Sequence, residues 1–410
     1  MQQVSDDTVT VAGARWGSFA AGIKRADEQG VHPLDLALLE LQAGSTVAAV
    51  FTQNAFKAAP VALAQQRLPL LNDYAGKIYC LINAGNANAG TGEAGFVAAE
   101  QSTEAIANAL STEQEAVLPF STGVIGEPLP VACFEANATK LVNSLCATGW
   151  EDAARAIMTT DTVPKLTQYT IIVGDETVNI AGIAKGAGMI KPNMATMLAY
   201  IVCDAAVDQN DLDALLSQAV NQSFNRITVD GDTSTNDACV LAATGASGAV
   251  LNASHPSWLA FSEAVCDVLR ELAIAIIRDA EGASKFIDLH ITGGASKEEC
   301  LAVGYAVAES PLVKTAFFAS DANWGRILAA VGRAGLHELD VNGVEIRLGN
   351  YLICANGGRV KNYSEPVAAG IMAKPSIRLS IELGRGNVSE RLWTSDLSHD
   401  YVSINADYRT

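Results

Sequence analysis

The chain has 410 residues, of which 49% are hydrophobic and 18% are charged, and its formal net charge is −18. This length and balance predict a well-packed globular protein of about two or three domains and argue against disorder. The acidic surplus argues against nucleic acid or an anionic membrane as a partner, because both attract Lys and Arg. An anionic substrate would therefore have to meet local cations or backbone N–H groups inside its pocket.

Eight cysteines are spread singly, without a C-x-x-C pair or a Cys/His cluster. This usage predicts reduced, mostly buried thiols in a cytoplasmic protein. The N-terminal sequence MQQVSDDTVTVAG is acidic and polar, whereas a signal peptide is basic and then apolar. Because no apolar run approaches the ~20 residues that span a bilayer, we expect no membrane segment.

Apolar residues at steps of three and four predict helices, and β-branched and aromatic runs predict strands. In chain order these are strand 77–83, helix 97–110, strands 166–173 and 177–184, strand 197–205, helix 211–224, helix 257–282 and strand-like segments 344–356 and 376–383. The helix over 211–224 has a capping signal at Asn210 and Asp211, and Gly282 is the natural end of the longest helix. The GDE between the strands at 166–173 and 177–184 predicts a hairpin.

These helices and strands are interspersed without a strict βαβ rhythm. We therefore expect a mixed α/β (α+β) protein with layered sheets rather than a parallel doubly wound sheet. No internal repeat and no low-complexity segment is present. A domain boundary is expected after Leu251 or near Pro311.

The stretch AKGAGMIKPNMATMLAYIVCDA (184–205) is the most unusual part of the chain. A strand is expected to end at Lys185, a loop rich in Gly and Pro follows, and Ala195-Thr196 stands directly before an apolar run. This arrangement suits attack of the Thr196 hydroxyl on the carbonyl of Ala195, which gives an ester that water then opens. The freed α-amino group has a reference pKa of roughly 8 and can serve as the general base for the same hydroxyl.

A histidine-dependent mechanism is not indicated, because none of the five histidines stands in an obvious catalytic context and no G-x-S-x-G elbow is present. By pattern alone, however, a threonine that opens a strand after a Gly/Pro loop is more often only a good β-former. The acidic motif VDGDTSTND (229–237) departs from EF-hand spacing and is interpreted as a turn that supports the site. The motif NAGNANAGTG (83–92) lacks the P-loop Lys-Ser/Thr, so we assign it to close backbone packing.

Several further motifs follow one another in order along essentially the whole chain. They are INAGNANAGTG (82–92), FSTGVIG (120–126), IMTTDT (157–162), VDGDTSTND (229–237), RDAEGASK (278–285), ASDANWGRI (319–327) and the terminal INADYRT. Together with the 184–205 stretch they resemble the ornithine acetyltransferase (glutamate N-acetyltransferase) family of arginine biosynthesis. The resemblance implies cleavage between Ala195 and Thr196 into pieces 1–195 and 196–410, which share one fold and pair into a heterotetramer of two copies each.

The resemblance also implies site residues. It places an oxyanion hole at Thr122 and Gly123, a task for which a hydroxyl beside a flexible backbone is suited, although the simpler interpretation is an ordinary turn. It assigns substrate contacts to Thr159, Lys185, Thr196, Glu281, Asn405 and Thr410, and it needs no metal and no cofactor. Within IMTTDT, Thr160 or Thr162 remains open as the contact in place of Thr159. Lys185 is equally a solvated surface lysine by pattern alone.

Glu281 is expected in the last turn of the helix over 257–282, where the helix dipole disfavours a carboxylate by about 0.3–1 kcal/mol. Such a placement suggests a task, and the family's task is contact with the amino group of the substrate. Pairing with Arg278 or Lys285 is the structural alternative.

The implied fold has two sheets between helical layers, resembling N-terminal-nucleophile enzymes, and a second, smaller α/β domain. The implied reaction is ping-pong transfer of an acetyl group from N2-acetyl-L-ornithine through Thr196 to L-glutamate, with acetyl-CoA as a further donor in some members. The alternatives are an aminopeptidase or amidase of the same self-cleaving architecture, and a non-catalytic amino-acid-binding protein.

Overall fold

The structure, a computed structural model, describes residues 2–3, 9–72, 74–191 and 197–407. The chain divides into two units. Unit 1 consists of Met1–Gly186, Pro192–Asn225 and Thr233–Ile276, and unit 2 consists of Ala187–Lys191, Arg226–Asp232 and Ile277–Thr410. The boundary expected after Leu251 or near Pro311 is wrong, since the first residue lies inside unit 1 and the second inside unit 2. Short internal segments change units, and no shift in composition marks them.

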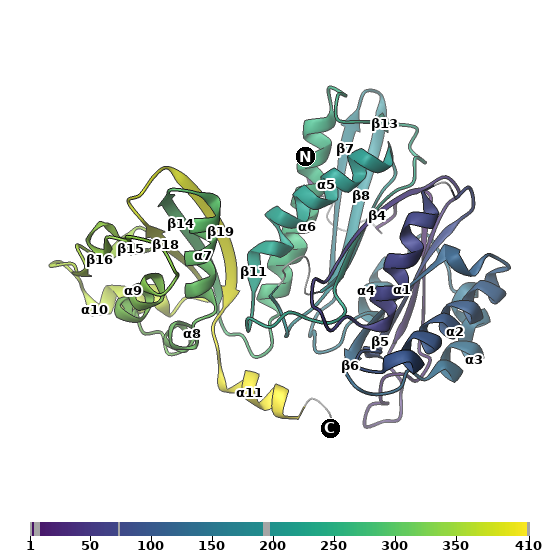
Figure 1. The fold of residues 1–410 in the computed structure, drawn as a ribbon, viewed down its shortest axis with the longest axis horizontal. Coiled ribbons are helices and arrows are strands. Elements are labelled where there is room, and N and C mark those ends of the chain that lie inside the picture. Colours follow the sequence, from purple (N-terminus) through teal and green to yellow (C-terminus); the bar gives the residue numbers. More distant parts are fainter. Residues whose placement is uncertain (1, 4–8, 73, 192–196, 408–410) are drawn as a thin grey trace. The chain divides into compact units, whose positions relative to one another are not determined.

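Unit 1 contains most of the described strands and all but the last two residues of α6, the longest described helix (Figure 1). Its elements are β1 (Gln2–Gln3), β2 (Ala14–Phe19), β3 (Leu36–Leu41), β4 (Thr46–Phe51), α1 (Ala59–Arg67), β5 (Ile78–Asn86), α2 (Gly92–Leu110), β6 (Val117–Val124), α3 (Val131–Asn143), α4 (Trp150–Ala156), β7 (Lys165–Val173), β8 (Glu176–Lys185), β9 (Leu198–Cys203), β10 (Ala206–Val207), α5 (Gln209–Gln222), β12 (Ala238–Ala243), β13 (Val250–Leu251) and α6 (Trp258–Arg278).

Two sheets form the centre of unit 1. One has the strand order β1-β7-β8-β9-β12-β4 and the other β2-β3-β5-β6. The pairs β7–β8, β8–β9 and β12–β4 are antiparallel, whereas β9–β12 and β5–β6 are parallel. This mixture of directions, with helices between the strands, confirms the predicted mixed α/β class.

The inner faces of these two sheets pack on each other. The ring of Tyr200 on β9 meets Trp16 on β2 and Phe120 on β6 edge-on, with centroids 5.7 and 5.3 Å apart. Aromatic rings prefer this geometry. The outer face of the β2-β3-β5-β6 sheet packs on α2 and α3. Across the other sheet, α6 places Val268 and Leu272 against Gly182 of β8, and α5 packs on β4 and β12. Unit 1 is therefore layered helix, sheet, sheet, helix, as predicted.

Unit 2 is the smaller of the two and is also mixed α/β. Its elements are β11 (Ile227–Thr228), β14 (Phe286–Gly294), α7 (Lys297–Ala308), α8 (Pro311–Phe318), α9 (Trp324–Gly332), β15 (Glu345–Leu348), β16 (Tyr351–Ala355), β17 (Gly358–Arg359), α10 (Glu365–Met372), β18 (Ser376–Glu382), β19 (Val388–Ser395) and α11 (His399–Ala406). The strands form one sheet in the order β11-β19-β14-β18-β15-β16-β17. Its apolar face packs against α7 to α10 around a single core.

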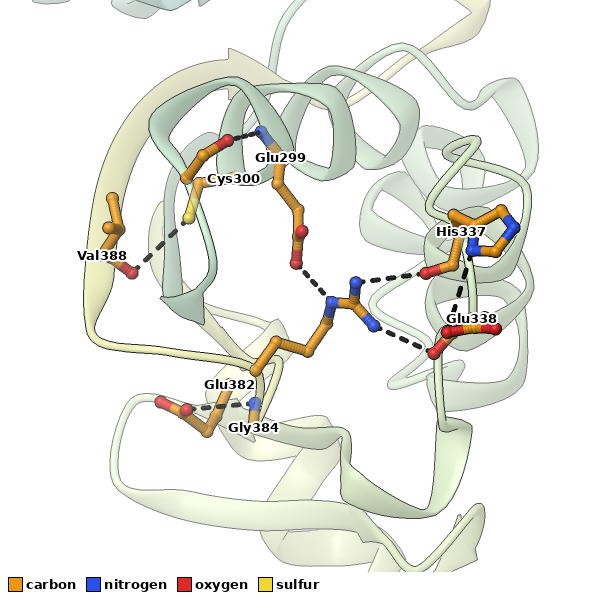
Figure 2. Close-up of polar contacts among 9 residues, drawn as sticks. Glu299, Cys300, His337, Glu338, Glu382, Gly384 and Val388 are labelled. Carbon is orange, nitrogen blue, oxygen red and sulfur yellow. Dashed lines mark hydrogen bonds and ion pairs between the residues drawn. The ribbon is translucent and has the colours of Figure 1, made fainter.

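A charged contact fastens the loops at one end of this core. Arg385, in the β18–β19 connection, donates Nε to the Glu299 carboxylate of α7 at 2.7 Å. Its two terminal nitrogens donate to the backbone carbonyls of His337 and Glu338 at 3.1 and 2.9 Å (Figure 2). One guanidinium thus ties a helix to the loop that precedes β15.

The predicted elements are largely confirmed. The hairpin at Gly174-Asp175 joins β7 and β8, with Val173 paired to Glu176. The cap of α5 is Asp208, whose side chain accepts from the amide of Asp211, so the predicted cap at Asn210 and Asp211 is wrong by two to three residues. The segment 344–356 is two antiparallel strands, because the chain reverses between Leu348 and Tyr351. No helix within the described residues is long and apolar enough to cross a membrane.

Candidate active site

The first candidate group lies in unit 1, where β6 ends at Ser121-Thr122-Gly123. Gly123 has a φ of +134°, and a Cβ there would overlap the backbone of Gly85 and Asn86 on the neighbouring strand β5. Only glycine combines this dihedral with so close an approach. The predicted close backbone packing of the 83–92 motif is confirmed at this point, and it places the Gly123 backbone at the end of a parallel strand pair.

Buried amides fix the backbone around this turn. The Ser121 hydroxyl donates to Asn83 Oδ1 at 2.6 Å, and Asn83 Nδ2 donates to the carbonyl of Asn86 at 2.8 Å. Asn236 Nδ2 donates to the carbonyls of Ser121 and Ala87 at 2.9 and 2.6 Å. The side chains of Asn83 and Asn236 are nearly fully buried. The 82–92 and 229–237 motifs therefore hold the residue that precedes Thr122.

Lys185 is the last residue of β8, as predicted, and it is not a surface lysine. It is 8% exposed, and its Nζ donates to the Thr122 hydroxyl oxygen at 3.2 Å. A hydroxyl that accepts a hydrogen bond from an ammonium keeps its own proton for a second partner. Thr122 and Gly123 can in this way present a donor to a negatively charged oxygen.

Asp161 is the buried hub beside this lysine. Its carboxylate accepts from Lys165 Nζ at 2.6 Å, from the Gly186 amide at 2.7 Å and from the Thr159 amide at 3.0 Å. Burial alone would raise the pKa of Asp161, but the charges of Lys185 and Lys165 and the Gly186 N–H outweigh it and lower the pKa to about 2. The carboxylate is therefore ionised at neutral pH and fixes the backbone that follows Lys185.

The motif IMTTDT indicated its threonines as candidate contacts and did not indicate Asp161. The signal was the Asp in that motif followed four residues later by Lys165. Thr159 and Thr160 are half-buried and Thr162 is exposed. The Thr159 amide donates to Asp161, and the choice among the three threonines as the substrate contact stays a prediction.

A third lysine adds to the local positive charge. Lys24 Nζ donates to the carbonyls of Leu34 and Ala156 at 2.7 and 3.1 Å. Burial lowers the pKa of Lys24 to about 8, and the charge of Lys185 lowers it further. The charges of Asp35 and Asp161 act in the opposite direction and raise it. Lys24, Lys165 and Lys185 thus place three amines in this part of unit 1.

The strand that follows the predicted nucleophile begins beside Lys185. Strand β9 is buried along its whole length, as predicted, and its first residue, Leu198, pairs with Lys185 in the antiparallel β8–β9 ladder. Ala195 and Thr196 themselves lie outside the described residues. The two strands that flank the predicted cleavage segment are therefore neighbours in one sheet.

The second candidate group lies in unit 2, around Glu281. This residue is 8% exposed and lies in a turn after α6, which ends at Arg278, so its predicted place in the last helical turn is wrong. The reason is local, since the Glu281 amide donates to the Ala187 carbonyl at 3.0 Å instead of continuing the helix. Asn405 Nδ2 donates to Glu281 Oε2 at 2.8 Å.

The first three residues of the C-terminal INADYRT motif belong to α11 (His399–Ala406), which packs on this turn. Ser398 caps α11, and its hydroxyl donates to the Gly282 carbonyl at 2.6 Å. Gly282 has a φ of +64°, and a Cβ there would overlap the Tyr401 amide. The predicted pair Glu281 and Asn405 is thus brought together within unit 2, whereas Thr410 lies outside the described residues.

The first carboxylate of the acidic 229–237 motif, that of Asp230, accepts hydrogen bonds from backbone amides. Asp230 accepts from the amides of Met189 and Ile190 at 2.7 and 3.0 Å. Among residues 2–3, 9–72, 74–191 and 197–407, no group of three or more His, Cys, Asp or Glu side chains is arranged to hold a metal ion. The supporting function predicted for this motif is visible at Asp230 and at Asn236.

The chain is similar to known proteins over almost its entire length. A family model described as the ArgJ family matches residues 15–410. The arginine biosynthesis bifunctional protein ArgJ of Pseudomonas syringae pv. tomato is 51% identical over 403 residues, which are 98% of this chain and 97% of that relative. The protein of the same name from Methylococcus capsulatus is also 51% identical over 403 residues, 98% of this chain and 96% of the relative.

A solved structure is similar to half of the chain. The crystal structure of arginine biosynthesis bifunctional protein ArgJ from Bacillus halodurans is 39% identical, covers 50% of this chain and 96% of that chain, and has a TM-score of 0.48. The family model and the full-length relatives decide the assignment. The chain belongs to the ArgJ family, the ornithine acetyltransferase family that its motifs resemble.

Proposed function

We propose that this protein transfers the acetyl group of N2-acetyl-L-ornithine to L-glutamate through an acetyl ester on Thr196, after cutting its own chain before that residue. The observation that carries the proposal is the buried contact of Lys185 with Thr122 at the end of β8. Leu198, two positions after Thr196, pairs with the same lysine. Family membership and the relatives' name as arginine biosynthesis proteins support the substrate class.

Self-cleavage would use the hydroxyl of Thr196 as the nucleophile. The oxygen attacks the carbonyl carbon of Ala195, the C–N bond breaks, and an ester replaces the peptide bond. Water hydrolyses that ester, which leaves a carboxylate on Ala195 and a free α-amino group on Thr196. With a reference pKa of roughly 8, this amine can take the hydroxyl proton in the next reaction.

Acetyl transfer would then run in two half-reactions. Thr196 Oγ attacks the acetyl carbonyl of the donor, the amide C–N bond breaks, and ornithine leaves with the proton held by the Thr196 amine. The amino group of glutamate attacks the acetyl ester, and Thr196 recovers its proton as N-acetylglutamate forms. Thr122 and Gly123 would stabilise the oxyanion of each tetrahedral intermediate, a contribution of about 10²–10³ in kcat for one donor.

The remaining side chains have separate proposed tasks. Lys185 and the half-buried Thr159 would bind the substrate, with Lys185 also polarising the Thr122 hydroxyl. Glu281 and Asn405, which share a hydrogen bond in unit 2, would contact the substrate amino group. A buried carboxylate suits a cationic amine, because burial strengthens the attraction between opposite charges.

A denaturing gel of the wild type beside Thr196→Ala tests the nucleophile. We expect two bands of similar size for the wild type and one for the variant, with an N-terminal threonine on the second piece. In the presence of acetylornithine alone, the 196–410 piece should gain the mass of one acetyl group. A wild-type chain that stays whole after long incubation contradicts the proposal.

Product analysis separates transfer from hydrolysis. Transfer needs glutamate as the acceptor, whereas an amidase of the same architecture releases acetate with or without it. A protein that binds the amino acid without catalysis would leave both substrates unchanged. Its binding of the amino acid would be the same in the wild type and in Thr196→Ala.

Three further parts of the proposal need their own assays. Acetyl-CoA is proposed as a second donor because the relatives are named bifunctional, and N-acetylglutamate formed from acetyl-CoA and glutamate is the readout. Self-association into two copies of each piece is tested by size-exclusion chromatography with light scattering. Cytoplasmic localisation, without attachment to a membrane, is tested by cell fractionation of the host organism. The proposed absence of nucleic acid and of a bound cofactor is tested on the purified protein by its absorption spectrum.

A further inference from the structure

A single carboxylate in unit 2 joins the two segments that contact Glu281. Asp230 Oδ2 accepts from the Met189 amide at 2.7 Å and from the Tyr401 hydroxyl at 3.1 Å, while Oδ1 accepts from the Ile190 amide at 3.0 Å. Met189 and Ile190 belong to the segment 187–191, and Tyr401 belongs to α11. One side chain therefore holds a loop and a helix that are far apart in the sequence.

The segment 187–191 is the first of these two segments, which we call the walls of the Glu281 site. The Ala187 carbonyl accepts from the Glu281 amide, and Gly188 lies so close to the Glu281 carboxylate that a Cβ on Gly188 would overlap both of its oxygens. The position of this backbone therefore decides where the carboxylate can lie.

This wall is held in a conformation that it would not adopt by itself. Met189 has a φ of +53°, which is uncommon and costly for a residue other than Gly, Asn or Asp. Strain of this kind persists only where the surroundings fix it. Here the fixing contacts are the two Asp230 oxygens, which accept from the amides on either side of the Met189 Cα, and the Val229 amide, which donates to the Ile190 carbonyl at 2.7 Å.

The second wall is α11, which carries Asn405. Tyr401 lies one helical turn before Asn405, and the Tyr401 carbonyl accepts from Asn405 Nδ2 at 3.0 Å. The same Nδ2 donates to Glu281 Oε2 at 2.8 Å. The Tyr401 hydroxyl bonds to Asp230, and the Tyr401 carbonyl bonds to Asn405, which in turn bonds to the Glu281 carboxylate.

We propose that Asp230 is a positioning residue of the Glu281 amine site, acting through the strained turn at Met189 and through Tyr401 on α11. The inference rests on the proposed function of Glu281 as the group that binds the substrate amine. Asp230 itself touches no reacting atom. Its effect is to set the two walls between which the Glu281 carboxylate is held.

The test compares Asp230→Asn with Asp232→Asn, a matched control that removes the same charge from an exposed side chain in the same loop. We expect Asp230→Asn to raise the KM for acetylornithine about 10- to 100-fold with a smaller loss in kcat, since a wall displaced by about 1 Å misplaces the substrate. Tyr401→Phe should raise it roughly fivefold. Asp232→Asn should behave as wild type.

A rescue experiment separates positioning from general loss of structure. Glycine adopts a positive φ without strain. The double variant Met189→Gly with Asp230→Asn should therefore have a KM for acetylornithine close to that of the wild type. A general folding defect would not be repaired at that position. If Asp230→Asn does not fold, the KM of Tyr401→Phe for acetylornithine tests the positioning role, and a raised KM supports it. An unchanged KM in a folded Asp230→Asn, or in Tyr401→Phe where that variant decides, overturns the inference.

The inference and the proposed function fail in different ways. If the wild type does not transfer acetyl groups, the proposed function fails, and ornithine binding to uncleaved Thr196→Ala, measured by calorimetry with and without Asp230→Asn, tests the inference. Weaker binding with Asp230→Asn supports it, and equal binding contradicts it. No ornithine binding to either protein contradicts both.

Discussion

The ammonium of Lys185 lies 3.2 Å from the hydroxyl oxygen of Thr122, and both side chains are within the buried part of unit 1. The two residues come from different sheets, since Lys185 ends β8 and Thr122 stands near the end of β6. The contact therefore joins the inner sides of two layers at the candidate oxyanion hole.

The first prediction concerns the hydroxyl of Thr122. Replacement by valine keeps the shape and removes the donor, so kcat for acetyl transfer should fall about 10²–10³-fold, with a smaller change in KM. Thr122→Ser keeps the hydroxyl and should stay within about tenfold of wild type. Steady-state kinetics with acetylornithine and glutamate give the comparison, and equal rates for the two variants would exclude Thr122 as a donor.

The second prediction concerns the stability that Asp161 provides. Its pKa lies below the usual 3.8, so the carboxylate contributes stability above about pH 4 that is lost as the pH falls toward about 2. Removing one member of a buried pair costs about 3–5 kcal/mol, and Asp161→Asn should lower the free energy of unfolding at pH 7 by that amount. Urea denaturation at pH 7 and at pH 3 measures both effects.

The control for Asp161 is the exposed pair Glu151–Arg155, which has the same spacing of four residues on α4. Glu151→Gln should leave the urea midpoint unchanged, because exposed ion pairs contribute little. If Asp161→Asn were as stable as this control, the buried carboxylate would not be the hub that the contacts indicate.

The third prediction concerns Gly123. Alanine at this position must accept a φ of +134° and overlap the Gly85 backbone, so acetyl transfer should be abolished and stability should fall by more than about 3 kcal/mol. Gly174→Ala is the matched control, because Gly174 has a φ of +62° but no atom near its missing Cβ. It should cost about 1 kcal/mol and leave activity unchanged. Thermal unfolding and kinetics of the two variants test this difference.

The fourth prediction concerns the thiols. Cys146 is exposed and Cys133 half-buried, whereas the remaining cysteines are buried, as the sequence analysis expected. Burial raises the pKa of Cys80 to about 12 and likewise that of Cys203 to about 12, so neither forms a reactive thiolate near neutral pH. An aromatic disulfide reagent at pH 8 should therefore modify Cys146 rapidly, Cys133 more slowly and the buried thiols only after unfolding.

The variant Cys146→Ser checks the assignment by mass spectrometry. It should lose the rapid phase and keep the slower one. Rapid modification of more than two thiols in the native protein would mean that the buried cysteines are more accessible than the structure shows.

The strands and helices with a strong local pattern could be predicted from the sequence. The period of α6 and the buried run of β9 each depend on side chains within the segment, and both were found where expected. What failed depends on distant contacts. Glu281 leaves the helix because its amide bonds to the Ala187 carbonyl, a partner more than ninety residues earlier in the chain.

The candidate site shows the same division. Thr122, Gly123 and Lys185 were found through motifs, and the structure brings them together in unit 1. Asp161 and Asn236 were missed, although both lie inside motifs that had been singled out, because each contacts backbone groups far away in the sequence, the Gly186 amide and the Ser121 carbonyl respectively. A pattern of side chains does not reveal which backbone atoms a buried carboxylate or amide will meet.

The pairing of β8 with β9 has a consequence for any attempt to make the two pieces separately. Six consecutive residue pairs, from Ile180 with Cys203 to Lys185 with Leu198, would join one polypeptide to the other after cleavage before Thr196. Each piece produced alone would expose the hydrogen-bonding edge of an apolar strand, and such edges aggregate. The uncut precursor therefore keeps β8 and β9 in one chain while they pair. Co-expression of 1–195 with 196–410 should give soluble protein, whereas neither piece should be soluble alone.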